Sequence, residues 1–217
     1  MKHLFKILFY ILFPFLVNAQ QSYPDSLRQA LENTSVDSIK VDLNLSLADF
    51  YEEKNLDSAL FFAEQAVLIA RKENQKLAEA AALNRKGYQL LSIGKYGESL
   101  QSLMEALSIA ENPDFEKNAW VFNNYSSITP MKYRLDILRI THHMYALLMN
   151  RTKNTEQEIF HYKEEIRISE KIGKQAGLQL AYMNLGDTYL RLNKLDTALD
   201  YSKKAASLAE KSGFKYY

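Results

Sequence analysis

Residues 181–205 read AYMNLGDTYLRLNKLDTALDYSKKA, two amphipathic stretches separated by a short break at Asn193 and Lys194. The same plan recurs in residues 82–106, ALNRKGYQLLSIGKYGESLQSLMEA, and again in residues 42–66, which end in DSALFFAEQA. The copies at 42–66 and 82–106 are offset from each other by 40 residues along both stretches. A period of this length, spanning two helices and a turn, indicates a stack of helical hairpins.

Small residues mark the places where the two helices of each hairpin would touch. In the last copy these are Gly186, Ala198 and Ala205. Two antiparallel helices approach closely only where side chains are small, so these positions predict the helix contact. The large side chains that share one face of the first helix are those of Tyr182, Leu185 and Tyr189.

This arrangement resembles the tetratricopeptide repeat, whose signature is a large residue, then Leu-Gly, Tyr, Ala, an aromatic residue and Ala. The last copy matches it at Tyr182, Leu185, Gly186, Tyr189, Ala198 and Ala205. Ser202 replaces the aromatic residue, and Leu47 replaces the small residue in the first copy. The resemblance implies an all-α fold, a right-handed α-α superhelix (solenoid) of about four helical hairpins.

Four repeats are expected at about 40–73, 80–113, 139–172 and 179–212, after a short amphipathic helix at 24–33. The third of them is degenerate, because Glu158 and Glu165 occupy sites that hold small residues elsewhere. Either this hairpin is more open than the others, or the repeat alignment is off by one residue.

The composition agrees with a helical protein. Of 217 residues, 47% are apolar and 24% are charged, and there are only 7 Gly and 4 Pro, which is few for a fold with many tight turns. The net charge of +1, with basic residues scattered among acidic ones, gives no reason to expect a nucleic acid partner. The absence of Cys excludes disulfides, thiolate metal sites and cysteine nucleophiles.

The N-terminus predicts export to a bacterial periplasm or cell envelope. Lys2 and Lys6 supply a positively charged start that overlaps an apolar run at 4–17. Val17 and Ala19 then place small residues three and one positions before Gln20, where a signal peptidase would cleave. The run is about 21 Å long as a helix, against roughly 30 Å of hydrocarbon. A signal peptide at 1–19, cleaved after Ala19, is therefore expected, and an uncleaved anchor is the alternative.

An insert at about 113–131 interrupts the repeats and contains Trp120, Phe122 and Tyr125. One interpretation is a loop or short helix whose aromatic side chains pack over the solenoid. The other is a contact arm for a ligand, since long inserts in compact folds are often functional.

No set of residues suggests catalysis, a metal site or a cofactor, so the chain is not expected to be an enzyme. His142 and His143 point about 100° apart on a helix and cannot chelate one metal as an i, i+4 pair would. We interpret them as surface or groove histidines. The paired carboxylates at 52–53 and 164–165 are interpreted as solvated faces.

Binding has better candidates, because the resemblance implies that the first helices of successive hairpins line a concave groove. Mapping each copy onto that helix selects Asn44, Tyr51, Asn84, Tyr88, His143, Asp187 and Arg191. Asn44 and Asn84 occupy equivalent places, and a file of amides could hold an extended peptide backbone by donating and accepting hydrogen bonds. The alternative is a polar, solvated groove with no special role.

The repeat period and the signal peptide together are similar to the exported N-terminal repeats of bacterial sensor histidine kinases. The function expected is that of a scaffold binding a protein or peptide, as the sensory or interaction part of a signalling protein. Two alternatives stay open: the N-terminal fragment of a two-component sensor kinase, and a structural protein that self-associates through an uncapped C-terminal end.

Overall fold

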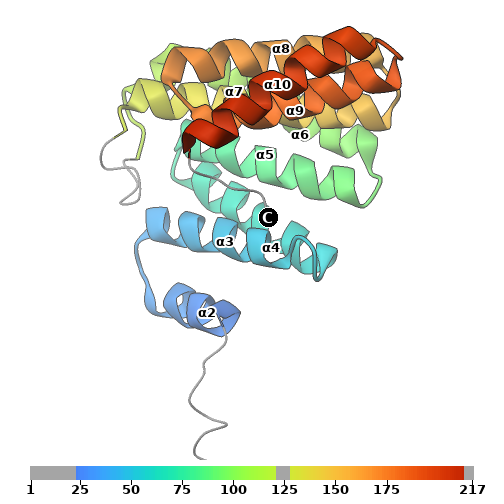
Figure 1. Cartoon of the computed structure of the whole chain (residues 1–217). Coiled ribbons are helices and arrows are strands. Elements are labelled where there is room, and N and C mark those ends of the chain that lie inside the picture. Colours follow the sequence, from blue (N-terminus) through green and yellow to red (C-terminus); the bar gives the residue numbers. More distant parts are fainter. Residues whose placement is uncertain (1–22, 121–127, 213–217) are drawn as a thin grey trace, which may run out of the picture.

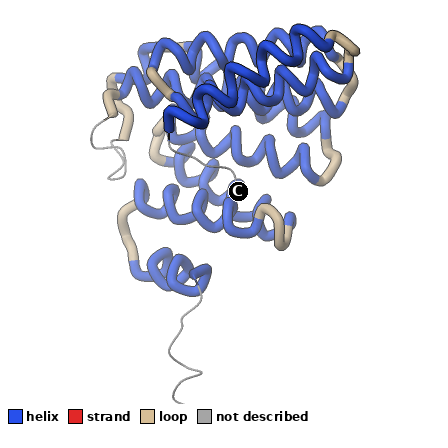
Figure 2. Tube along the Cα trace, viewed as in Figure 1, coloured by secondary structure: helices blue, strands red, loops and turns tan. Residues whose placement is uncertain are grey.

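The computed structural model describes residues 23–120 and 128–212, and within these ranges all regular structure is helical (Figures 1 and 2). The elements are α2 (Tyr23–Asn33), α3 (Asp37–Tyr51), α4 (Leu56–Lys72), α5 (Lys76–Ser92), α6 (Tyr96–Glu111), the short 3-10 helix η1 (Pro113–Glu116), α7 (Pro130–Arg151), α8 (Thr155–Ile172), α9 (Gln175–Arg191) and α10 (Leu195–Ser212).

Eight of these helices form four antiparallel hairpins, α3–α4, α5–α6, α7–α8 and α9–α10. The hairpins stack in chain order, and α2 packs against α3 at one end (Figure 1). Each helix contacts chiefly its neighbours in sequence, and α5 also contacts α7 across the stack. The all-α superhelix of helical hairpins predicted from the repeats is thereby confirmed.

Apart from the connection between α6 and α7, the turns between helices are short, and most of them contain a left-handed residue. Gly94 and Gly173 have φ of 81° and 72°, and Asn74 and Asn193 have φ of 53° and 56°. Glycine adopts this conformation without a steric penalty, and asparagine tolerates it better than most other residues. The break at Asn193 seen in the sequence is therefore a tight turn between α9 and α10.

Small residues do mark the helix contacts. Ala59, Ala63 and Ala66 on α4 are fully buried. Gly87 on α5 lies directly against Leu103 of α6, so close that a Cβ added to Gly87 would be 2.8 Å from Leu103 Cδ2. The Ser99 hydroxyl donates to the Gly87 carbonyl at 2.7 Å, which joins the two helices at the same point.

The described part of the insert packs on the solenoid. Phe115, Ala119 and Trp120 lie against the largest apolar cluster, and the backbone N–H of Trp120 donates to Gln75 Oε1 at 3.0 Å. This contact favours the packing interpretation for Trp120. Phe122 and Tyr125 lie outside the described residues, and a ligand contact by the insert stays a prediction.

No described helix is both long enough and apolar enough to cross a membrane. The expected signal peptide at 1–19 lies outside the described residues.

Candidate binding cavity

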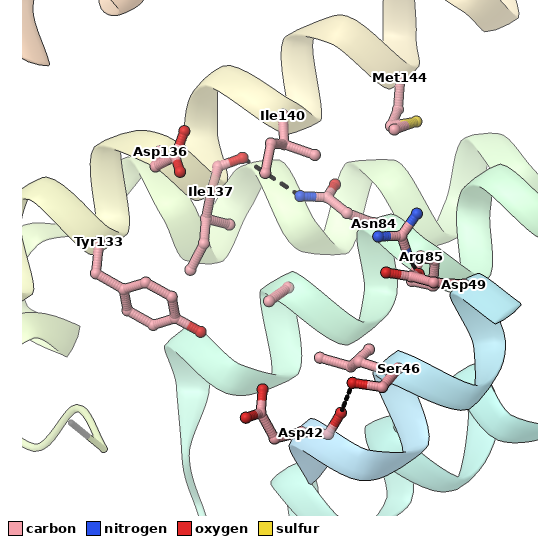
Figure 3. A pocket seen from close by; sticks show the side chains of 12 residues that line it. Asp42, Ser46, Asp49, Asn84, Arg85, Tyr133, Asp136, Ile137, Ile140 and Met144 are labelled. Atoms are coloured by element: carbon pink, nitrogen blue, oxygen red, sulfur yellow. Dashed lines mark hydrogen bonds and ion pairs between the residues drawn. The ribbon is translucent and has the colours of Figure 1, made fainter. Parts of the chain in front are cut away.

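A cavity of about 310 Å³ opens between α3, α5 and α7, the first helices of three successive hairpins (Figure 3). We call it the first-helix cavity. Its lining residues are Asp42, Leu45, Ser46, Asp49, Ala81, Asn84, Arg85, Tyr133, Asp136, Ile137, Ile140 and Met144. Apolar side chains come from all three helices, and the other lining residues include three carboxylates, an amide and one guanidinium.

Helix geometry explains how the carboxylates reach the cavity. Asp42, Ser46 and Asp49 are spaced i, i+4 and i+7 on α3, so they share one helical face. Asp136 comes from the first two turns of α7 on the other side. The cavity therefore receives acidic side chains from two separate hairpins.

Arg85 is the single basic residue among the described residues that line the cavity, and it is already engaged. Its Nε atom lies 2.7 Å from Asp49 Oδ1, and its Nη1 atom lies 3.5 Å from Glu52 Oε2. The Asp136 carboxylate forms ion pairs with two basic residues that do not line the cavity, Arg139 Nε at 2.7 Å and Lys174 Nζ at 3.3 Å. An anionic ligand would therefore find no unengaged cation in this lining.

Burial raises the pKa of Asp42 above its ordinary value. Burial also raises the pKa of Asp49, while Arg85 lowers it and Glu52 raises it further. The Asp49 side chain lines the cavity and is still 51% exposed to solvent, so solvent screens much of this effect. A cation beside either carboxylate would favour its charged form.

Asn84 contributes a buried amide to the cavity wall. Its Nδ2 atom donates to Thr141 Oγ1 at 2.9 Å and to the Ile137 carbonyl at 3.3 Å. The reverse amide orientation would set two carbonyl oxygens against each other, so the nitrogen belongs on that side. Oδ1 consequently has no hydrogen-bond partner, although Asn84 is only 3% exposed.

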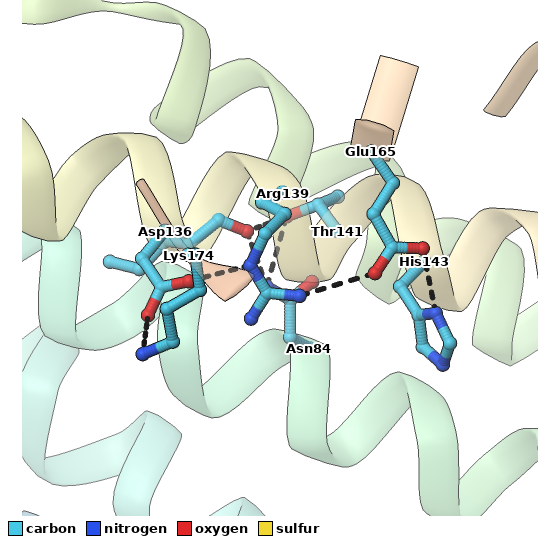
Figure 4. A network of polar contacts seen from close by, with 8 residues as sticks. Asn84, Asp136, Arg139, Thr141, His143, Glu165 and Lys174 are labelled. Carbon is cyan, nitrogen blue, oxygen red and sulfur yellow. Dashed lines mark hydrogen bonds and ion pairs between the residues drawn. The ribbon is translucent and has the colours of Figure 1, made fainter. Parts of the chain in front are cut away.

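A chain of buried polar contacts backs the cavity (Figure 4). Glu165 on α8 is 0% exposed, and it accepts from Arg139 Nη1 at 3.2 Å and contacts His143 Nδ1 at 2.9 Å. Arg139 in turn donates to Asp136 in the cavity lining at 2.7 Å. The interpretation of residues 164–165 as a solvated face is therefore wrong for Glu165, because Arg139 and His143 of the facing helix give it buried partners.

Glu158, the other acidic residue at a small site, is also buried, at 2% exposure. It accepts from Arg191 at 2.6 Å, from the Thr188 hydroxyl at 2.7 Å and from Asn150 at 3.0 Å. These partners come from α7 and α9. Ion pairs and hydrogen bonds thus replace the small-residue contact of the other hairpins around α8.

His142 and His161 form a second buried pair, each 7% exposed. Their Nδ1 atoms are 2.9 Å apart, so one ring donates to the other and the acceptor must be neutral. Tyr145 stacks on His161 with ring centroids 4.7 Å apart. Burial lowers the pKa of His142 and lowers that of His161 to about 4. The expectation of a surface or groove histidine is wrong for His142, because α8 covers it.

The structure does not bring the seven groove residues together in one site. Asn84 lines the first-helix cavity, whereas Asn44 is buried and donates to its own helix at the Lys40 carbonyl. Because both amides are buried, they do not form the expected open file. Tyr51 stacks on Phe62 at the α2 end.

The other four predicted residues are dispersed along the stack. Tyr88 is half-buried, and burial raises the pKa of its hydroxyl. His143 contacts Glu165, and Asp187 pairs with Arg191. Binding by any of the seven residues stays a prediction.

Sequence reasoning missed Asp42, Asp49, Arg85 and Asp136, which supply the charges of the cavity. The i, i+4, i+7 polar stripe of Asp42, Ser46 and Asp49 was a usable signal, because it lies on the first helix of a hairpin. Asp136 had no such signal, since it lies before residue 139, where the third repeat was expected to begin. In the described part of the chain, no group of three or more His, Asp or Glu side chains could hold a metal ion.

Two family models match the sequence. One, described as the SusR N-terminal TPR domain, matches residues 16–109, and a tetratricopeptide repeat model matches residues 180–212. The chain contains tetratricopeptide repeats. The likeness to sensor histidine kinases is not confirmed by these matches, and no curated protein matches the sequence significantly.

Solved structures share the fold of these tetratricopeptide repeats. BtubC (BKLC) from P. vanneervenii aligns with a TM-score of 0.63 at 15% identity, covering 88% of this chain and 73% of that one. Aspartyl phosphate phosphatase F from Bacillus subtilis aligns with a TM-score of 0.67 at 18% identity, covering 86% of this chain. The chain spans less than half, 45%, of the phosphatase. At these identities the likeness establishes the fold alone.

Proposed function

We propose that this tetratricopeptide-repeat chain is a non-catalytic module that binds a protein or peptide segment at the first-helix cavity. The observation that carries the proposal is the cavity itself, which spans three successive hairpins and combines apolar walls with polar groups. Ligand sites commonly have this composition, with apolar surface supplying area and a few polar groups fixing orientation. A scaffold of tetratricopeptide repeats is suited to protein binding because successive hairpins present a continuous surface.

The proposal includes export and a place in signalling. The support for export is the charged start and apolar run of residues 1–19. The support for signalling is the resemblance of the repeated segments to exported sensor repeats. In this proposal, binding at the first-helix cavity changes how neighbouring hairpins pack, and that change is passed on to a signalling partner.

The binding proposal is tested by filling the cavity. Ser46→Trp places an indole among the lining residues, whereas Ser108→Trp places the same group on the exposed side of α6 as a matched control. The full chain and both variants are applied to an array of random dodecapeptides. We expect the wild type and Ser108→Trp to bind the same peptides and Ser46→Trp to lose them.

A second cavity variant guards against a local folding defect. Met144→Trp fills the cavity from α7 instead of α3 and is expected to lose the same peptides. Far-ultraviolet circular dichroism reports whether each variant keeps its helices. Failure of the wild type to bind any peptide, or equal binding by all four proteins, would overturn the proposal.

A further inference from the structure

We propose that the first-helix cavity receives a basic side chain, lysine or arginine, from the bound peptide. This inference rests on the proposed function, because it names the chemistry of the segment bound at the same site. It is carried by the charge of the lining, by an unpaired amide oxygen in the cavity wall, and by the apolar side chains of the lining.

The charge around the cavity favours a cation. The carboxylates that line it or back its lining are Asp42, Asp49, Glu52, Asp136 and Glu165, and the basic side chains are Arg85, Arg139 and Lys174. Three of these carboxylates line the cavity with one guanidinium, that of Arg85, and the remaining charged groups lie behind the lining. Each of the three basic side chains already contacts at least one of these carboxylates, so an entering ammonium or guanidinium would meet a surplus of negative charge.

The Asn84 amide adds a second, independent indication. Its side chain reaches from α5 toward α7 in the wall of the cavity (Figure 3). Its nitrogen is committed to Thr141 and Ile137, and its Oδ1 atom is a buried acceptor without a partner. A buried acceptor of this kind is stabilised by a donor, and a ligand donor reaches Oδ1 by displacing the side chains that shield it. Lysine and arginine side chains carry only donors, three and five N–H groups respectively.

The apolar lining of the cavity fits the stem of such a residue. Ile137, Ile140 and Met144 line the cavity from α7, and Leu45 lines it from α3 beside Asp42 and Asp49. Lysine and arginine bury their methylene groups along apolar surface while the charged head reaches polar partners. A volume of about 310 Å³ admits a side chain and a short piece of backbone and excludes a folded domain.

The test is a double-mutant cycle on one array peptide. The probe is the tightest-binding dodecapeptide from the array, compared with the same peptide in which each arginine is replaced by citrulline and each lysine by norleucine. The protein variant is Asp42→Asn combined with Asp49→Asn. Its matched control neutralises two exposed aspartates of α10, Asp196→Asn with Asp200→Asn.

We expect the peptide substitution to weaken binding to the wild type by about tenfold or more, and by much less in the cavity variant. The α10 control should bind both peptides as the wild type does. Peptides that bind in the cavity without lysine or arginine, or an equal loss in both proteins, would overturn the inference while leaving the proposed function standing. Absence of any cavity-dependent peptide binding would instead overturn the proposed function.

A last measurement compares the binding of a small free cation with that of the peptide. Agmatine carries a guanidinium without a peptide backbone, and we expect it to bind more weakly than the array peptide. Agmatine binding as tight as that of the peptide would overturn the assignment, because the cavity would then be a site for a small amine.

Discussion

Glu165 of α8 is fully buried and contacts two side chains of α7. Its carboxylate contacts Arg139 at 3.2 Å and His143 at 2.9 Å while being shielded from solvent. A buried ion pair is weak evidence of net stabilisation, but removal of one partner leaves the other charge buried and unpaired. The cost of removing Glu165 should therefore be much larger than that of a surface carboxylate.

We expect Glu165→Gln to lower the free energy of unfolding by about 2 kcal/mol, because Arg139 keeps Asp136 but loses its second carboxylate in a buried place. The adjacent Glu164 is the matched control. It pairs with Arg167, whose side chain is mostly exposed, so Glu164→Gln should change stability by about 0.5 kcal/mol or less. Urea unfolding followed by circular dichroism measures both. Equal effects of the two substitutions would contradict the assigned burial of Glu165.

The His142–His161 pair predicts a dependence of stability on pH. Burial holds the pKa of His161 at about 4, below the value of about 6.5 expected in the unfolded chain. Between these values the unfolded chain binds more protons than the folded one, so the contribution is present above pH 6.5 and is lost as pH falls toward 4. The negative charge of Glu164 acts against burial by raising the pKa of both histidines. The positive charge of Arg167 acts with burial by lowering the pKa of His142.

The measurement is the free energy of unfolding in urea at pH 7 and at pH 5, for the wild type and for His161→Asn. We expect the wild type to lose about 1–3 kcal/mol more than the variant over this interval. Subtracting the variant removes the contribution of carboxylates, which both proteins share. An identical loss in both proteins would show that the buried histidine pair does not titrate in this way.

At the scale of helices, α5 and α6 approach closely where Gly87 meets Leu103. Glycine within a helix normally costs about 1 kcal/mol relative to alanine. Replacing Gly87 by alanine would recover this cost, but the new Cβ would lie only 2.8 Å from the fully buried Leu103. Gly97, at the start of α6, has open space around it.

We therefore expect Gly97→Ala to raise the free energy of unfolding by about 0.5–1 kcal/mol, and Gly87→Ala to lower it by about 1 kcal/mol or more. The two variants change the same residue type in adjacent helices, so each controls for the other. Thermal melts would compare them directly. Stabilisation by Gly87→Ala would mean that Leu103 moves aside at little cost.

The helices could be predicted well from the sequence because their signals are local. Gly87 and Gly186 each mark a contact between the two helices of their own hairpin, and Asn193 marks the turn within one. The positions of Glu158 and Glu165 could be located, but not their partners. Arg191 and Arg139 reach them from neighbouring helices, 33 and 26 residues away, and no period in the sequence links them.

Across the whole molecule, the candidate site was predicted less well than the fold. The groove residues were chosen by equivalence between repeats, which placed Asn84 in the cavity but also selected Asn44, whose amide is buried. The cavity depends on how α7 is set against α3 and α5 after an insert that breaks the period. Its charges therefore come from residues, such as Asp136, that a regular repeat would not select.

The stack also predicts how the whole chain unfolds. Each hairpin packs chiefly on its sequence neighbours, so among the described helices α10 depends on α9, and α9 on α8. In such an array, local stability is set by nearest-neighbour interfaces, and one end can unfold before the rest. Trp120, the single tryptophan, packs against the central cluster and reports on the middle of the stack.

We expect Ala205→Asp, at the α9–α10 contact, to give an early urea transition in circular dichroism while the midpoint of Trp120 fluorescence stays unchanged. A carboxylate at this buried position has no partner, so it destabilises the last hairpin locally. Ala106→Asp, at the equivalent place in α6, is the control and should move both signals, because α6 packs against α5 and α7 beside Trp120. If Ala205→Asp shifted the fluorescence midpoint as far as Ala106→Asp does, the four hairpins would unfold as one cooperative unit, held together through links such as the Glu158–Arg191 pair.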